Sequence, residues 1–488
     1  MQLRAGRRQI SVRDAFLTRS VRSPGSLGRS DILAGAASVL CCLGLFTLSW
    51  EQLGNIGLGS YNVKLPVVLF TIAAIVGAPR WWASLRRIRA LSRPARLVVP
   101  LAVAVVVILV VRSLTASPVS AGLAQVAAVL TGAVAPALAV LAVVATRADV
   151  AWALRWIIAG AGVAGVFGLW QLFAFYVGLP QLITYTGVGT SGVGGRISAF
   201  SYEPAYFAYF LVFAGTAVIA LAVLEQRRVR WLAIGFFGVI LTLVNVRALT
   251  FVLPVAAVLL LVSFRQNRRV VARSAAAAAV LIVASLALPF AVDFVASHLP
   301  TPQTTTATGP ESPRAKESTR AEPTSTPSAK PLLPLPVAPP TEVLDPNEPS
   351  SNEPRLALYR AVLRVDQNHI AFGVGPGQLR RALAEVGYVA PNQGEQVVAN
   401  NIWLQAAADG GVLLLLVELS IVVMVALLWW SLRRTAVQPL ASGWLAVVLV
   451  GGMLTSYFFD LKVWVFLALI LAVSAERGAV RQPTSEAA

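Results

Sequence analysis

Clusters of arginine recur along this chain between apolar stretches that are about as long as a membrane is thick. Of its 488 residues, 57% are hydrophobic and only 13% are charged, and the mean hydropathy is +0.72. No soluble domain has that balance, and about 20 consecutive apolar residues are enough for one membrane crossing. The pattern predicts an all-α polytopic membrane protein.

The net charge of +18 raises the question of nucleic acid as a partner. The basic residues, however, sit in short segments beside the apolar stretches, which is the positive-inside pattern of cytoplasmic loops. We therefore expect a lipid bilayer and no nucleic acid. Cys41 and Cys42 lie inside the first apolar stretch and are expected to be inert small hydrophobes.

The basic segments also predict how many times the chain crosses the membrane. They lie at the N-terminus and at 80–96, 147–155, 225–230, 265–273, 433–434 and 477–481. Seven cytoplasmic segments joined by six hairpins require twelve spans, with both termini in the cytoplasm. The first apolar stretch is expected to be an uncleaved span rather than a removed signal peptide.

Residues 231–264 test this count, because they form one nearly unbroken apolar stretch with a basic segment at each end. A single helix of that length would be about 50 Å long, far more than the hydrocarbon core of a bilayer. Two basic ends on the same side therefore predict two crossings and a short external turn at 245–247. Arg247 is then at the outer surface, where a lone charge is a functional candidate.

The same count of membrane crossings places residues 178–202 and a long loop, roughly 293–409, outside the cell. Residues 300–354 of that loop hold 14 of the 29 prolines and are too poor in apolar residues to bury a core. The expected order of parts is a basic cytoplasmic tail (1–30), spans one to nine (31–295), a disordered Pro/Ser/Thr-rich tether (296–354), a helical extracytoplasmic cap (355–409), spans ten to twelve (410–475) and a cytoplasmic tail (476–488).

The cap, which forms the large outer loop between spans nine and ten, is predicted to be mostly helical. Pro354 suits the start of a helix over 355–367, and a second, short helix is expected to end at Gly387. The next span is expected to begin near Val412. The first helix has one apolar stripe, made of Leu356, Tyr359 and Leu363.

Two glycine-rich stretches, 187–195 and 373–377, invite comparison with phosphate-binding loops. Neither has a strand before it and a helix after it, and neither ends in Gly-Lys-Ser/Thr, so we expect turns at the membrane surface instead. The two histidines, His298 and His369, are far apart and form no metal-binding spacing. We therefore expect neither a metal nor a cofactor.

Arginines are the most informative polar residues on the predicted outer face. They are Arg196, Arg247, Arg355 and Arg360. Guanidinium groups suit bidentate binding of phosphate, so a lipid-linked diphosphate is the expected ligand. Interfacial anchoring or plain solvation would also explain Arg196 and Arg355. Glu203 precedes a span, and a carboxylate at the N-terminus of a helix is favoured by the helix dipole, so capping alone would also explain it.

Four segments resemble the O-antigen ligase and O-antigen polymerase superfamily of bacterial membrane glycosyltransferases. They are GRISAFSYEPAYFA (195–208), NVRA (245–248), R-x4-R followed by NHIAFGVGPG (355–377), and ANNIWLQAAADGG (399–411). Their order, and twelve spans with a large outer loop between the ninth and tenth, match the family over most of residues 30–475. One position departs from the family pattern. Asn400 stands where the ligases carry a histidine that activates the acceptor, and this difference favours a polymerase.

The resemblance implies an enzyme of the bacterial inner (plasma) membrane that transfers a polyprenyl-diphosphate-linked glycan to an acceptor sugar hydroxyl outside the cell, without a metal. It implies that the diphosphate is bound by Arg196, Arg247, Arg355 and Arg360. Glu203 is then the candidate general base, Asn400 a second catalytic residue, and Asn401 a ligand of sugar hydroxyls. The implied partners are the lipid-linked glycan, an acceptor glycan and a chain-length regulator.

Three other readings remain open. The chain could be a ligase of the same superfamily, which passes finished glycan to a lipid or protein acceptor. It could be a transporter or flippase, although such proteins place ionisable groups near the middle of the membrane rather than at one end. It could also be a structural or signalling membrane protein, which would leave the cap and its arginines without a role.

Overall fold

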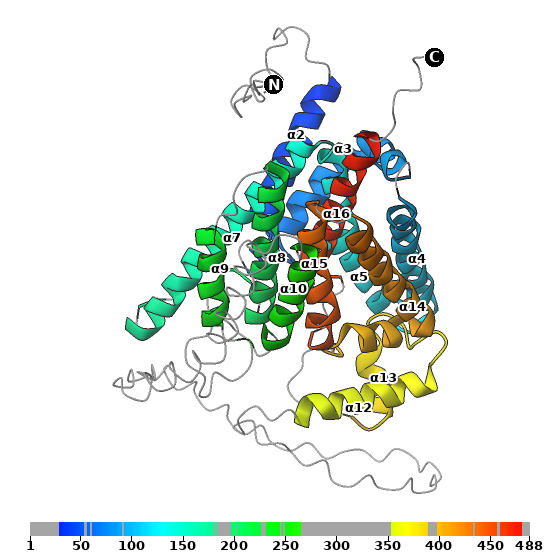
Figure 1. Cartoon of the computed structure of the whole chain (residues 1–488). Helices are drawn as coiled ribbons and strands as arrows, with labels where there is room; N and C mark the ends of the chain where they lie inside the picture. Colours follow the sequence, from blue (N-terminus) through cyan, green and yellow to red (C-terminus); the bar gives the residue numbers. More distant parts are fainter. Residues whose placement is uncertain are drawn as a thin grey trace, which may run out of the picture.

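The computed structural model describes most of the helical regions of the chain. The described residues are 29–52, 56–58, 61–89, 92–177, 179–180, 182, 197–201, 203–225, 231–244, 246, 249–264, 353–388, 398–432, 435–455 and 459–480. Within these ranges the chain is a bundle of apolar helices with a small helical cap across one end (Figure 1). The tether predicted at 296–354 lies almost wholly outside the described residues.

The first half of the bundle contains α2 (Arg29–Phe46), α3 (Leu65–Arg89), α4 (Arg93–Thr115), α5 (Val119–Val129), α6 (Ala135–Val143) and α7 (Arg147–Val177). A single π-helical segment, Leu130–Val134, joins α5 to α6, so the two make one continuous rod. A two-stranded antiparallel hairpin, β1 (Ile56–Leu58) and β2 (Tyr61–Val63), leads into α3.

The second half contains α8 (Pro204–Glu225), α9 (Trp231–Val244), α10 (Leu249–Phe264), α12 (Glu353–Asn368), α13 (Leu379–Glu385), α14 (Ile402–Ser431), α15 (Val437–Leu449), the 3-10 turn η2 (Gly451–Met453) and α16 (Leu461–Val480). Helices α8, α15 and α16 pack at the centre, and α8 is the most buried of the long helices. Helix α8 therefore places Glu203, the residue just before it, in the middle of one end of the bundle.

The helix lengths confirm a helical membrane protein. Among the described residues, six helices are long and apolar enough to cross a membrane: Leu65–Ile88, Arg93–Thr115, Val119–Val143, Arg147–Ala174, Pro204–Glu225 and Ile402–Ser431. Five shorter apolar helices accompany them: Asp31–Phe46, Trp231–Val244, Phe251–Ser263, Val437–Met453 and Leu461–Ala475. The span expected just before residue 295 lies outside the described residues, so the total of twelve stays a prediction.

The long apolar stretch 231–264 is divided as expected, because α9 ends at Val244 and α10 begins at Leu249. The two ends of the bundle differ in their contacts. At one end, Arg87 donates to the carbonyl of Ala145, and Arg155 forms an ion pair with Glu225. Helix α2 begins and α16 ends at this end, and the cap lies at the other (Figure 1). Which side of the membrane each end faces stays a prediction.

The cap has a small core of its own, and its first helix buries a different face from the one predicted. Helix α12 begins and ends as the sequence indicated, but Leu356 and Leu363 are 47% and 48% exposed. Its buried residues are Leu358, Ala361, Val362 and Val365. The expectation of an apolar stripe at Leu356, Tyr359 and Leu363 was wrong as a guide to burial, because α12 has apolar residues on two faces and packing against α13 and α14 selects one.

Helix α14 also differs from the prediction. It begins at Ile402 rather than near Val412, and Asn401 caps its first turn. Gly411 interrupts it with a φ of 68° and a ψ of −165°, a conformation that residues with a side chain rarely adopt. The segment before Gly411 therefore belongs to the cap interface, and the segment after it has the composition of a span.

Candidate functional site

The glutamate that begins α8 is the centre of a polar group at the cap-covered end of the bundle. The carbonyl of Glu203 accepts hydrogen bonds from the backbone of Tyr206 at 3.1 Å and Phe207 at 3.3 Å, so Glu203 is the N-terminal cap of α8. Its side chain is half-buried. A carboxylate is favoured at this end of a helix by the helix dipole.

Four influences act on the protonation of Glu203. Burial raises the pKa of its carboxyl group most strongly, and the negative charge of Glu51 raises the pKa further. The positive charges of Arg355 and Lys64 lower it, and the net shift is upward. A carboxylate with a raised pKa is a stronger base than an ordinary surface glutamate.

The segment just before Glu203 is bound to its neighbours through its backbone. The amide nitrogens of Glu51 and Gln52 both donate to the carbonyl of Phe200 at 2.9 Å. The side-chain amide of Gln52 donates to the carbonyl of Ser201 at 2.9 Å. From the other side, the amide of Gln171 on α7 forms hydrogen bonds of 2.8 and 3.2 Å with both backbone groups of Ala199. The approach to Glu203 is therefore held on two sides.

Aromatic packing supports the same segment. The ring of Phe200 stacks on Phe167 of α7, with 4.2 Å between centroids, and lies 5.0 Å from the ring of Trp50. Such contacts hold the segment in one conformation with little conformational freedom.

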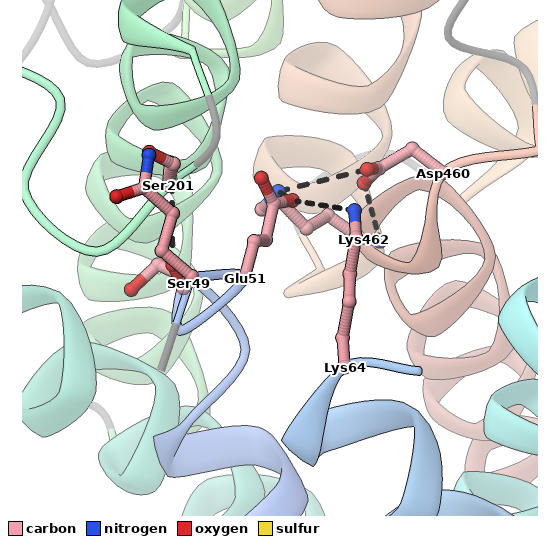
Figure 2. A network of polar contacts seen from close by, with 7 residues as sticks. Ser49, Glu51, Lys64, Ser201, Asp460 and Lys462 are labelled. Carbon is pink, nitrogen blue, oxygen red and sulfur yellow. Dashed lines mark hydrogen bonds and ion pairs between the residues drawn. The ribbon is translucent and has the colours of Figure 1, made fainter. Parts of the chain in front are cut away.

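A buried ion network lies beside this segment (Figure 2). Lys462, which is 0% exposed, forms ion pairs with Glu51 and, at 3.6 Å, with Asp460. Lys64 lies 3.9 Å from the same Glu51 carboxylate and is about one-third exposed. Lys462 also lies 5.7 Å from the ring centre of Tyr206 on α8. Four charged side chains from two distant parts of the chain thus meet next to the start of α8.

The cap contributes a second set of polar groups to this end. The hydroxyl of Tyr359 on α12 lies 3.0 Å from the carbonyl of Asn400 and 3.1 Å from that of Met453. Burial of Tyr359 raises the pKa of its hydroxyl. Arg355, one helical turn earlier, is exposed, and its charge acts on Glu203 as described above. Helix α12 therefore presents Arg355 to the carboxyl group at the start of α8.

Asn400 and Asn401 differ in the hydrogen bonds that their side chains make. The side-chain oxygen of Asn401 accepts from the backbone nitrogens of Trp403 at 2.9 Å and Leu404 at 3.2 Å, and its nitrogen donates to Met453 at 3.1 Å. Asn401 is thus a helix cap that also ties α14 to η2. Asn400 is half-buried and has a φ of 51°, which asparagine tolerates better than most residues.

The glycine-rich loop 373–377 forms part of the cap interface. The guanidinium of Arg112 at the end of α4 donates to the carbonyl of Gly373 at 2.9 Å, and the nitrogen of Val374 donates to Ala408 at 2.7 Å. A Cβ atom on Gly373 would lie only 2.7 Å from the carbonyl oxygen of Ala407. Glycine here permits backbone to approach backbone, which agrees with a turn at the membrane surface and gives no support to a nucleotide-binding loop.

The structure places only some of the predicted site residues. It brings Arg355 towards Glu203 and places Asn400 beside Tyr359 of the same cap helix. Arg360 is exposed and, within the described part of the chain, makes no hydrogen bond or ion pair. Arg196 and Arg247 lie outside the described residues. Their assignment to a phosphate-binding cluster stays a prediction.

The ion network was not predicted from the sequence. Glu51 follows the first apolar stretch, and Asp460 and Lys462 stand at the start of the last one. Ionisable residues so close to an apolar span are functional candidates by default, and that signal was present. Arg112 was missed in the same way at the end of α4. Among the described residues, no group of three or more His, Cys, Asp or Glu side chains is placed to hold a metal ion.

As a whole, the group combines a half-buried carboxyl group of raised pKa with one exposed cation, Arg355, and one partly exposed cation, Lys64. Glu203 can accept a proton, while Arg355 and Lys64 can face an anionic ligand. An arrangement of this kind suits a reaction in which a hydroxyl is deprotonated while negative charge develops on a leaving group.

Comparison with known protein families gives a match for part of the chain. Residues 231–419 match the family described as O-antigen ligase. No curated protein matches the chain. The matched segment includes α9, α10, the cap and the first part of α14. It ends before Asp460 and Lys462, the members of the ion network at the start of α16. Residues 231–419 therefore carry an O-antigen ligase domain, which supports the resemblance to the O-antigen ligase and polymerase superfamily.

Proposed function

We propose that this protein is an envelope glycan polymerase of the bacterial inner membrane. It transfers a polyprenyl-diphosphate-linked oligosaccharide to a hydroxyl of an acceptor sugar on the extracytoplasmic side. The O-antigen ligase domain and the apolar helices indicate a membrane enzyme that processes glycans. The observation that carries the finer proposal is Glu203, a half-buried carboxyl group with a raised pKa at the cap-covered end of the bundle, within the field of Arg355.

In the proposed reaction, the carboxylate of Glu203 takes the proton of the acceptor hydroxyl. The acceptor oxygen then forms a bond to the anomeric carbon of the donor sugar. The bond from that carbon to the diphosphate oxygen breaks, and its electron pair leaves with the polyprenyl diphosphate. Arg355 stabilises the negative charge that develops there, and Arg196, Arg247 and Arg360 are proposed to contribute to the same task. A raised pKa makes Glu203 the stronger base for the first step.

The two asparagines take different roles in this proposal. The side chain of Asn401 already has partners for both of its amide atoms, so its contribution is to hold Asn400 in place rather than to bind sugar by itself. Asn400 is proposed to form a hydrogen bond with a sugar hydroxyl. It cannot act as a base, because an amide does not ionise in this range, and this leaves Glu203 as the base.

A deletion strain separates polymerase from ligase. If the protein is a polymerase, the mutant strain accumulates single repeat units on the lipid carrier or on the final acceptor. If long polymer remains attached to the lipid diphosphate instead, the protein is a ligase. Electrophoresis of the extracted glycans distinguishes the two patterns.

A transporter is the second candidate, and one observation favours it. Glu418 lies deep in α14, is 1% exposed, and neither of its carboxyl oxygens has a hydrogen-bond partner in the described part of the chain. Buried ionisable groups of this kind occur in ion and proton pathways. Purified protein in detergent, without any ion gradient, tests this reading. Elongation of a lipid-linked glycan under those conditions supports the enzyme, and its absence together with gradient-driven uptake in vesicles supports the transporter.

A further inference from the structure

Glu51 is almost fully buried, and its charge has definite partners. Its side chain is 2% exposed, and its carboxylate forms an ion pair with the fully buried Lys462. Lys64 lies 3.9 Å away on the opposite, more open side. Figure 2 shows these side chains converging on Glu51 from the start of α3 and the start of α16. The buried lysine against it compensates the charge of the Glu51 side chain.

The backbone around Glu51 is tied to the segment that leads to Glu203. Glu51 and Gln52 both donate to Phe200. The hydroxyl of Ser201 lies 3.3 Å from the carbonyl of Ser49 and completes the connection in the other direction. Ser201 is two residues before Glu203. Any displacement of the loop that carries Glu51 therefore displaces the start of α8 with it.

Charged or titratable groups on four elements lie around Glu203 and the ion network beside it. Lys64 precedes α3, Arg355 belongs to α12, Tyr206 and Tyr209 lie on the first turns of α8, and Asp460 and Lys462 stand at the start of α16. The negative charge of Glu51 raises the pKa of Glu203, and the positive charges of Arg355 and Lys64 lower it. The protonation of Glu203 therefore depends on Glu51 remaining charged and in place.

We propose that Glu51 is a positioning residue for Glu203: the Lys462–Glu51 ion pair holds the approach to α8 and keeps a negative charge beside the catalytic carboxyl group. This inference rests on the proposed function, in which Glu203 is the general base. Glu51 itself does not contact substrate in this scheme. Its effect is to make Glu203 a stronger base than Arg355 and Lys64 alone would allow.

The test uses Glu51→Gln in the full-length purified protein, because glutamine keeps the shape and can still accept a hydrogen bond from Lys462. The rate of glycan transfer is measured as a function of pH. Loss of the negative charge lowers the pKa of Glu203. The acid limb of the rate profile, which is the pH range in which the rate falls as Glu203 becomes protonated, should therefore move to lower pH. The plateau rate should fall as well, because a base of lower pKa is weaker. A purely structural role would lower the rate at every pH and leave the limb in place, and that result overturns the proposal.

Two further variants guard against misfolding and unrelated charge effects. Glu51→Asp keeps the negative charge beside Glu203 and should leave the limb close to that of the unchanged protein. Glu225→Gln removes a carboxylate at the opposite end of α8, where Glu225 pairs with Arg155, and should leave the limb unmoved. A shift in the Glu225 variant equal to that in the Glu51 variant would contradict the proposal.

Infrared spectroscopy separates failure of this inference from failure of the proposed function. The band of a protonated carboxyl group that disappears in Glu203→Gln belongs to Glu203, and its titration needs no catalysis. In Glu51→Gln this band should titrate at lower pH than in the unchanged protein. An unchanged titration overturns the role of Glu51. Absence of glycan transfer by the unchanged protein contradicts only the proposed function.

Discussion

At the scale of single residues, the chemistry of this protein depends on how its environment changes one carboxyl group. A glutamate in water is ionised at neutral pH and is a weak base. At Glu203, partial burial and the nearby Glu51 raise the pKa, while Arg355 and Lys64 limit the rise. The pKa of this side chain is thereby brought closer to the range in which a general base is effective.

Replacement of Glu203 by glutamine should reduce glycan transfer by about 100-fold or more, which is the usual contribution of a general base. The base must be deprotonated to act, and its pKa is raised, so the rate of the unchanged protein should fall as the pH is lowered through that raised pKa. Transfer assays over a range of pH check both expectations. Full activity of the Glu203→Gln variant at every pH would contradict the role.

Replacement of Arg355 by alanine removes the cation that the cap presents to Glu203. We expect a loss of about 100-fold in transfer rate, since one stabilising group of this kind contributes a few kcal/mol in the transition state. Arg364→Ala is the matched control, because Arg364 is exposed on the same helix and lies more than two turns further along. Equal rates in the two variants would exclude a specific role for Arg355.

The residues of the candidate site were predictable to different degrees. Glu203 and Arg355 were chosen from the sequence as charged residues on the predicted outer face, in segments that resemble the O-antigen ligase and polymerase superfamily. The capping role of Asn401 was not predicted, although asparagine before an apolar run is a common helix start. Glu51 and Lys462 could not be paired from the sequence, because nothing local indicates which distant charge each one meets.

At the scale of elements, the cap is joined to the bundle by close backbone contacts. The loop that follows α12 crosses the kink of α14, where the nitrogen of Val412 donates to the carbonyl of Ile370 at 2.8 Å. On the other side, Gln378 donates to the carbonyl of Pro118 at 3.2 Å, between α4 and α5. The position of Arg355 therefore depends on the contacts of this loop as well as on its own helix.

Replacement of Gly373 by alanine should weaken this connection. Gly373 has a φ of +64°, and an added Cβ would meet the backbone of α14 on one side. Strain and overlap together should lower the free energy of unfolding by about 1–3 kcal/mol. The midpoint of thermal unfolding of the purified protein in detergent measures the loss.

Gly162→Ala is the control for this prediction. Gly162 lies inside α7, and a Cβ there would have no neighbour within 4 Å. Alanine favours a helix over glycine by up to about 1 kcal/mol, so this variant should be as stable as the unchanged protein or slightly more so. If Gly373→Ala were as stable as Gly162→Ala, the close approach of the loop would not matter for folding.

At the scale of the whole molecule, the cap end of the bundle is proposed to face outward and the opposite end the cytoplasm. The buried positions of Cys41 and Cys42, which are 0% and 3% exposed, make a cysteine-labelling test direct, because buried thiols react slowly. A single cysteine introduced at the exposed position Arg364 of the cap should react with an impermeant reagent added outside intact cells.

A cysteine at the exposed position Arg86, near the end of α3, should react only after the cells are opened. The reverse pattern at either position would invert the orientation and remove the candidate site from the extracytoplasmic side. Substitution of these exposed residues leaves the packing of the bundle unchanged, so expression of each variant can be compared directly with the unchanged protein.

Local sequence patterns are enough to predict that this chain forms apolar helices, that residues 231–264 form two of them, and that the cap begins with a helix near Pro354. These properties depend on segment length, local composition and turn residues, which act within a few residues of each other. The buried face of α12 and the charges that meet beside Glu203 depend instead on how helices distant in sequence pack together. Glu51 and Lys462 are 411 positions apart, and a buried ion pair at that separation forms only when the packing of several helices brings both ends to one place.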